Sequence, residues 1–203
     1  MTARGSAKMR TEEILNACER LYGRMSFKEV TIKEIGAETS FSRPSIYNYF
    51  QTKEEIFLAL FEREYLLWGD ELEGVLGSLP APSLIPARIA ETLEKRELML
   101  KLLAMNLYDM EENSRIERLV SFKQAYGRSV SVFDAIIKSA FPAMTDDERR
   151  RMLLSAFEFM HGVYPYARAT AKQIEAMAKA GVRYDKKSLY ELALDGLQRI
   201  IKL

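Results

Sequence analysis

Residues 30–53 read V-T-I-K-E-I-G-A-E-T-S-F-S-R-P-S-I-Y-N-Y-F-Q-T-K, and this stretch predicts three helix starts in quick succession. Thr31 and Thr52 each stand three residues before a Glu. This is the spacing of a capping box, in which the Thr hydroxyl accepts a backbone N–H and the Glu reaches back. Ser42 can cap the helix between them, because Pro44 needs no intrahelical N–H in a first turn. Two short helices followed at once by a long helix predict a helix-turn-helix.

The middle helix of the three indicates what the unit does. Ile46 and Phe50 are one helical turn apart and are expected to point into the core. The opposite face then presents an acid-free set of side chains, namely Arg43, Pro44, Ser45, Tyr47 and Asn48. A helix surface without carboxylates suits the phosphate-lined grooves of DNA. The other interpretation is a solvated helix in a helical bundle.

The run S-R-P-S-I-Y-N-Y-F-Q-T-K-E-E-I-F (42–57) resembles the DNA-binding signature of the TetR family of bacterial repressors. That signature has a small polar pair, an aliphatic residue, a Tyr, two variable positions and an aromatic residue, followed by a Ser/Thr-Lys-Glu helix start. T-I-K-E-I-G-A (31–37) resembles the helix that precedes it. In one departure, Ser40 stands where the family usually has Gly in the turn. Ser40 is therefore expected to hold a left-handed conformation at a cost of about 1 kcal/mol.

The resemblance is specific over about residues 10–60 and implies an all-α chain with two domains. It implies a DNA-binding helix-turn-helix domain at residues 1–53 and an effector-binding and dimerisation domain at 54–203, linked by the helix from Thr52. It also implies DNA contacts at matching positions. Base edges would be faced by Lys33, Arg43, Pro44, Ser45 and Asn48, and phosphates would be held by Thr31, Tyr47, Tyr49 and Lys53. Ser42, at the start of the same helix, would also belong to the DNA-binding residues.

The charge distribution agrees with this division. The whole chain of 203 residues has a net charge of +1, but residues 1–53 hold nine Lys and Arg against six Glu. The positive charge is thus concentrated where the motif lies. Residues 1–10 are basic and acid-free, which predicts either a loosely ordered arm along phosphates or a minor groove, or a frayed terminus.

The sequence gives little support for a metalloprotein, an enzyme or a membrane protein. The single cysteine, Cys18, falls on an apolar stripe, so we expect a packed side chain rather than a redox sensor or metal ligand, and no metal or cofactor. The only histidine, His161, has no nucleophile or acid in a catalytic pattern beside it, so no catalytic residues and no enzyme are expected. No apolar run approaches membrane-spanning length, and a cytoplasmic protein without membrane contact is expected.

The rest of the chain predicts helices and no strand alternation. The expected ranges are 52–75, 84–94, 96–110, 114–140, a helix from 145 that continues to about 178, and 186–202. Pro165 should kink or break the fifth of these. The resemblance implies that the two C-terminal helices form a four-helix homodimer interface. Such a dimer would read half-sites of a near-palindrome about 34 Å apart or multiples of that distance.

The resemblance further implies a pocket for a small, largely apolar effector in the second domain. Met, aromatic and His side chains are the candidates for its lining, namely Met99, Met105, Phe122, Tyr126, Phe157 and His161. Ordinary core packing is the competing interpretation for most of them. For His161 it is a hydrogen-bonded buried polar group.

The predicted function is a homodimeric transcriptional regulator, a repressor that a small molecule releases from double-stranded DNA. The effector need not touch the DNA-binding unit if it selects a dimer conformation unfit for the operator. One alternative is a DNA-bound adaptor whose helical domain binds another protein. The other is a helical-bundle enzyme with a vestigial helix-turn-helix.

Overall fold

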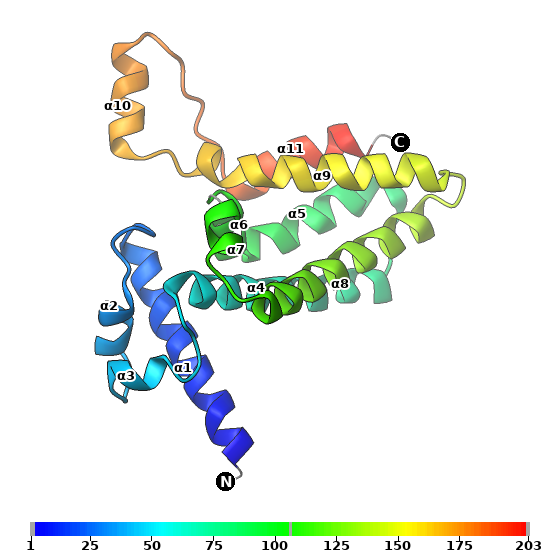
Figure 1. Ribbon diagram of the computed structural model, residues 1–203. Coiled ribbons are helices and arrows are strands. Elements are labelled where there is room, and N and C mark those ends of the chain that lie inside the picture. Colours follow the sequence, from blue (N-terminus) through cyan, green and yellow to red (C-terminus); the bar gives the residue numbers. More distant parts are fainter. Residues whose placement is uncertain (1–2, 106, 202–203) are drawn as a thin grey trace. The chain divides into compact units, whose positions relative to one another are not determined.

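The computed structural model describes residues 3–105 and 107–201, and over these residues the chain is built from helices alone (Figure 1). The helices in chain order are α1 (Ala3–Arg24), α2 (Ile32–Ala37), α3 (Arg43–Ile46), α4 (Lys53–Gly77), the 3₁₀ turn η1 (Pro82–Leu84), α5 (Ile85–Lys95), α6 (Glu97–Leu103), α7 (Leu107–Glu112), α8 (Ile116–Ala140), α9 (Asp146–Ala167), α10 (Ala171–Lys179) and α11 (Leu189–Ile200). The predicted all-α class is confirmed. None of the described helices is long and apolar enough to cross a membrane.

The chain divides into two compact units. The first comprises Met1–Arg63 and Asn106–Ala125, and the second Glu64–Met105 and Tyr126–Leu203. α4 and α8 each give their N-terminal part to the first unit and their C-terminal part to the second. The domain boundary between residues 53 and 54 remains a prediction.

The core of the first unit is a cluster of aromatic and aliphatic side chains. Helices α1, α3 and α4 all contribute to it. Ile46 and Phe50 are fully buried, as their spacing predicted. The ring of Phe57, from α4, meets those of Tyr22 and Phe27 edge-on, with centroids 5.1 and 4.8 Å away. Edge-to-face pairs of this kind add to the stabilisation from burial.

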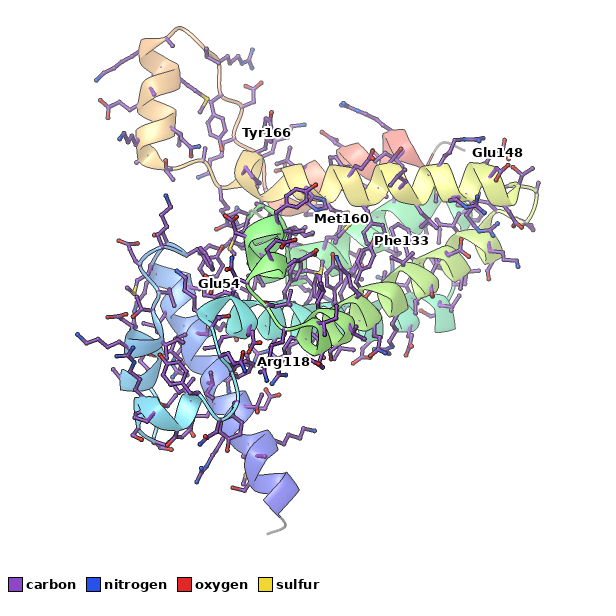
Figure 2. The ribbon with its side chains drawn as sticks, in the orientation of Figure 1. Glu54, Arg118, Phe133, Glu148, Met160 and Tyr166 are labelled. Atoms are coloured by element: carbon purple, nitrogen blue, oxygen red, sulfur yellow. The ribbon has the colours of Figure 1, made fainter. Side chains whose placement is uncertain are left out.

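The second unit is organised around Trp68. Its indole Nε1 donates to the Thr92 hydroxyl at 2.9 Å, so its only polar atom is satisfied in the interior. The rings of Phe133 and Phe157 approach it edge-on, with centroids 6.3 and 5.9 Å away. Figure 2 shows Phe133 among the helices of this unit, where α11 packs on α5 and α9. α10 has no buried residue and stands apart from α9 and α11 (Figure 1).

Helix ends follow the local signals in part. Thr145 forms a complete capping box at the start of α9, as its T-D-D-E run suggests. The predicted box at Thr52 is only half formed. Its Oγ1 accepts the Glu55 N–H at 3.2 Å, but the Glu55 carboxylate turns to other donors. The cause is an arginine far along the chain, which takes both oxygens of that carboxylate.

Three predicted segments differ from the structure. Residues 3–10 are the first turns of α1 and not a loose arm, because Ala, Lys, Met and Arg there are good helix formers; residues 1 and 2 lie outside the described part. The helix expected over 96–110 is two helices, α6 and α7. The helix expected from 145 to about 178 is also two helices, α9 and α10, and the break that Pro165 predicted falls two residues after it.

Candidate nucleic-acid interface

The face of α3 opposite its buried side carries the residues that the sequence assigned to DNA. Arg43, Pro44, Tyr47 and Asn48 are exposed, and Ser45 is half-buried. The Arg43 guanidinium donates to the Tyr47 hydroxyl at 3.3 Å, across one helical turn. The helix is therefore held by Ile46 while its polar side remains open to a ligand.

α2 and α3 cross closely at a glycine. A Cβ on Gly36 would lie 3.3 Å from Cβ of Arg43 and 3.5 Å from Cδ1 of Ile46. Glycine at this position lets the two helices approach without displacing the start of α3. The close approach fixes one end of α3 against α2.

The turn between these helices is unstrained, which corrects the expectation for Ser40. Among residues 3–105 and 107–201, no residue other than glycine has a positive φ. The Ser40 N–H donates to the carboxylate of Glu13, and its hydroxyl donates to the other carboxylate oxygen at 3.1 Å. Anchoring to α1 replaces the left-handed turn that a glycine would allow.

The other residues that the sequence assigned to DNA lie in different settings. Thr31 and Lys33 are exposed, although the Thr31 hydroxyl also accepts the Glu34 N–H at 3.3 Å. Ser42 is exposed, and its hydroxyl lies 3.1 Å from that of Ser45 instead of capping the backbone. Tyr49 is half-buried.

Lys53 makes more contacts within the protein than its sequence position suggested. Its Nζ donates to the carbonyls of Phe27 at 2.8 Å and Val30 at 3.3 Å. It also lies 4.1 Å from the centre of the Phe27 ring, a cation–π distance. One of its three N–H donors is left for a phosphate.

An ion pair between the buried Glu55 and the exposed Arg115 lies beside this face and was not anticipated from the sequence. The Glu55 carboxylate accepts Arg115 Nε at 2.6 Å and Arg115 Nη2 at 2.9 Å, together with the backbone N–H groups of Gln51 at 2.8 Å and Arg115 at 3.1 Å. Burial alone would raise the pKa of Glu55, but these hydrogen bonds outweigh it and lower the pKa to about 2. No local signal reveals the pair, because its members stand 60 positions apart.

This ion pair predicts acid sensitivity. Because the folded-state pKa of Glu55 lies below the ordinary value, the stabilisation is complete above about pH 4.5 and is lost as pH falls towards 2. We expect Glu55→Gln to lower the free energy of unfolding by about 3 kcal/mol at pH 7 and by progressively less below pH 4.5. Urea unfolding at pH 7, 4.5 and 3 measures this. Glu117→Gln, at an exposed acid of the same unit, is the control; a pH-independent Glu55→Gln difference would contradict the assignment.

Two predictions about single residues have different outcomes. Cys18 is fully buried, and burial raises the pKa of its thiol to about 12, which fits a packed side chain. His161 is exposed, so the expectation of a buried polar group is wrong, although its Nδ1 lies 2.9 Å from the Phe157 carbonyl. Position 161 falls on the outward face of α9. Within the described residues no group of three or more His, Cys, Asp or Glu could hold a metal ion.

The other candidates for an effector pocket lie in both units. Tyr126 and Phe157 meet edge-on in the second unit, with ring centroids 5.4 Å apart. Met99 is buried on α6, and Met105 is half-buried just after it. Phe122 is buried in the first unit, its ring 5.0 Å from that of Phe61.

Comparison with known proteins identifies both parts of the chain. The family model described as bacterial regulatory proteins, tetR family, matches residues 14–60, and the model described as Tetracyclin repressor-like, C-terminal domain, matches residues 62–201. An uncharacterized HTH-type transcriptional regulator of Bacillus subtilis, YfiR, is 38% identical over 53 residues. That stretch is 26% of this chain and 26% of the relative. The match thus spans about a quarter of each protein.

Solved structures of similar fold cover nearly the whole chain. FadR of Bacillus subtilis, in complex with stearoyl-CoA, has a TM-score of 0.63 at 14% identity and covers 94% of this chain and 97% of its own. FadR of Thermus thermophilus, a TetR-family repressor in complex with lauroyl-CoA, has a TM-score of 0.59 at 18% identity and covers 95% and 93%. FadR of Bacillus halodurans has a TM-score of 0.62 at 14% identity and covers 95% and 94%. At these identities the likeness shows the fold.

The two family models together span nearly the whole chain. They agree with the observed helix-turn-helix and its acid-free exposed face. The chain belongs to the TetR family and is a DNA-binding transcriptional regulator rather than an enzyme.

Proposed function

We propose that this regulator is a homodimeric repressor that binds a near-palindromic operator and is released from it by a small, largely apolar ligand. The observation that carries the DNA part is the exposed, acid-free side of α3, with Arg43, Pro44, Tyr47 and Asn48 turned outward. Selection from a genomic fragment library at physiological salt tests it. A shared near-palindrome among bound fragments is expected, and enrichment without any motif would contradict it.

Base recognition is assigned to individual side chains of this face. Asn48 suits bidentate pairing with adenine and Arg43 with guanine, and Pro44 offers an apolar contact to a thymine methyl. Thr31, Lys33, Tyr47, Tyr49 and Lys53 complete the proposed contacts, and Lys53 contributes with the one donor that the protein leaves free.

We expect Asn48→Ala to relax the preference at one base pair per half-site by about 1–3 kcal/mol, because the bidentate contact is lost. Competition binding with operators substituted at each position measures this. Gln124→Ala, which removes an exposed amide on α8, is the matched control. An equal loss of affinity for every sequence would instead assign Asn48 to the DNA backbone.

The proposed dimer uses α9 and α11. Both helices pack on one another within the second unit, and α9 exposes the apolar side chains of Leu154 and Tyr166, at 59% and 73%. Exposed apolar groups on the helices expected at a two-fold interface support a self-complementary contact.

For the effector, we propose a molecule with a long apolar chain, and fatty acyl-CoA is the first class to test. Two of the similar structures are complexes with lauroyl-CoA and stearoyl-CoA. In this chain the support is the ring cluster around Trp68, where Tyr126 and Phe157 meet. The other proposed residues of the effector site are Met99, Met105, Phe122 and His161.

The single tryptophan reports directly on this proposal. Titration with lauroyl-CoA should change Trp68 fluorescence and release the operator over the same concentration range, whereas CoA alone should do neither. A ligand that binds without changing operator affinity would contradict release by this class. α4, which runs from Lys53 to Gly77 and contributes to both units, would carry the displacement by favouring one dimer conformation.

One observation favours the adaptor alternative. Tyr108, Ile116 and Val120, on α7 and α8, are exposed at 81%, 64% and 47%. An exposed apolar set outside the proposed dimer helices is what a protein partner would cover. Loss of regulation in cells by Ile116→Glu, with dimerisation and operator affinity unchanged in vitro, would support the adaptor.

A further inference from the structure

The first compact unit contains more than the helix-turn-helix. The segment Asn106–Ala125 belongs to it, although the family match to the DNA-binding domain ends at residue 60. Arg115 immediately precedes α8, and Arg118 lies in its first turn (Figure 2). Both side chains donate to the carbonyl of Tyr49, near the end of residues 43–50, which we call the recognition segment.

Arg118 holds Tyr49, the last residue of the turn after α3, and Phe50, which follows it. Its Nη2 donates to the Tyr49 carbonyl at 2.9 Å, and its guanidinium lies 4.7 Å from the centre of the buried Phe50 ring. A guanidinium at that distance over an aromatic face is a cation–π contact. A carbonyl acceptor and a ring together fix both the position and the direction of the backbone at residues 49 and 50.

The chain segment that carries Arg118 is held in place by hydrogen bonds of its neighbours Asn113 and Arg115. Arg115 is held by two side-chain hydrogen bonds to the fully buried Glu55, and the Thr52 hydroxyl donates to the Asn113 carbonyl at 3.0 Å. A bidentate pair of this kind has a defined geometry. These hydrogen bonds connect the residues just before α8 to the start of α4, which directly follows residues 49–51 in the chain.

α3 needs such support because it is short. It spans four residues, Arg43–Ile46, and a helix of this length has no stability of its own. Its beginning is set by the close crossing with Gly36. The direction of its far end depends on what holds Tyr49 and Phe50.

The surroundings do not suit a phosphate contact at Arg118. A surface hollow of about 430 Å³ is lined by Asn48, Tyr49, Arg115 and Arg118, but also by Glu117. The carboxylate of Glu117 would repel a phosphate. Arg115 already donates through Nε and Nη2 to Glu55 and, at 3.4 Å, through Nη2 to the Tyr49 carbonyl.

We propose that Arg118, held in place by the Arg115–Glu55 pair, is a positioning residue that sets the direction of α3 for base recognition without touching DNA. This inference rests on the recognition role proposed for α3. Its consequence is that sequence discrimination depends on a residue outside the helix-turn-helix.

The test compares Arg118→Ala and Arg118→Lys with wild type, and uses Lys123→Ala as the control. Lys123 lies on the same helix and carries the same charge, but pairs with Glu111 at 2.6 Å. Affinities for the selected operator and for a scrambled duplex are measured over a range of salt concentrations. Amide exchange of residues 46–50 is measured without DNA.

We expect Arg118→Ala to lower the operator-to-scrambled affinity ratio about tenfold, the size of one poorly read base pair, with an unchanged salt slope. Arg118→Lys should recover part of the ratio, because an ammonium can still donate to the carbonyl. Exchange at Tyr49 and Phe50 should be faster in Arg118→Ala and unchanged in Lys123→Ala.

Equal losses on both duplexes with a salt slope shallower by about one would make Arg118 a phosphate contact and overturn the proposal. A ratio equal to that of Lys123→Ala would also overturn it. If Arg118→Ala does not fold, Arg118→Lys decides by the same comparison. If wild type selects no operator, the proposed function fails instead, and the exchange data alone decide whether Arg118 orders the end of the recognition segment.

Discussion

A Leu154→Glu variant is expected to be monomeric and to bind the operator at least about 100-fold more weakly than wild type. Leu154 is the exposed apolar side chain in the middle of α9, and a two-fold interface presents it twice. A monomer reads one half-site and loses the gain in effective concentration that links two half-sites, which amounts to a factor of roughly 10²–10⁴.

Analytical ultracentrifugation gives the oligomeric state, and titration of a full operator and of an isolated half-site gives the affinities. Leu84→Glu is the matched control, since Leu84 is 53% exposed in the 3₁₀ turn of the same unit. The half-site affinity of Leu154→Glu should equal that of wild type. A dimeric Leu154→Glu variant would place the interface elsewhere.

The second large effect is expected in the core of the second unit. We expect Trp68→Ala to lower the free energy of unfolding by about 3–5 kcal/mol, because removing a fully buried indole leaves a cavity among Tyr65, Phe133 and Phe157. That is a large part of the 5–15 kcal/mol typical of folded domains. Urea unfolding followed by circular dichroism measures it.

Trp68→Phe separates the two contributions of the indole. It keeps a ring in place but removes the Nε1 donor to Thr92, whose hydroxyl still donates to the Ile89 carbonyl at 2.7 Å. The cost should therefore be about 1 kcal/mol, that of one hydrogen bond. If Trp68→Ala costs no more than Trp68→Phe, the indole does not organise this core.

Features that depend on residues close together in the chain were predictable. The cap at Thr31, the capping box at Thr145 and the burial of Ile46 and Phe50 all follow from spacings of three or four residues. Helical geometry brings such neighbours together in any context. The motif, the all-α class and the family follow from signals of this range.

Two predictions failed because a distant residue supplied the partner. Ser40 was expected to be strained because it stands where the family usually has Gly in the turn, but Glu13 of α1 binds it. Glu55 has the spacing of a capping box, but Arg115 takes its carboxylate. A prediction from neighbouring residues cannot include a contact whose second residue lies far away in the chain.

The amino-acid sequence alone is thus enough to establish that a helix-turn-helix exists, which of its faces is polar and which family it belongs to, because periodicity and capping are local. Folding in three dimensions settles how the recognition segment is held. Tyr49 and Phe50 meet Arg118 only after α8 has returned to the first unit, 69 positions later in the chain for the Tyr49 hydrogen bond. The energy of that contact comes from geometry between segments, and no pattern along the chain encodes it.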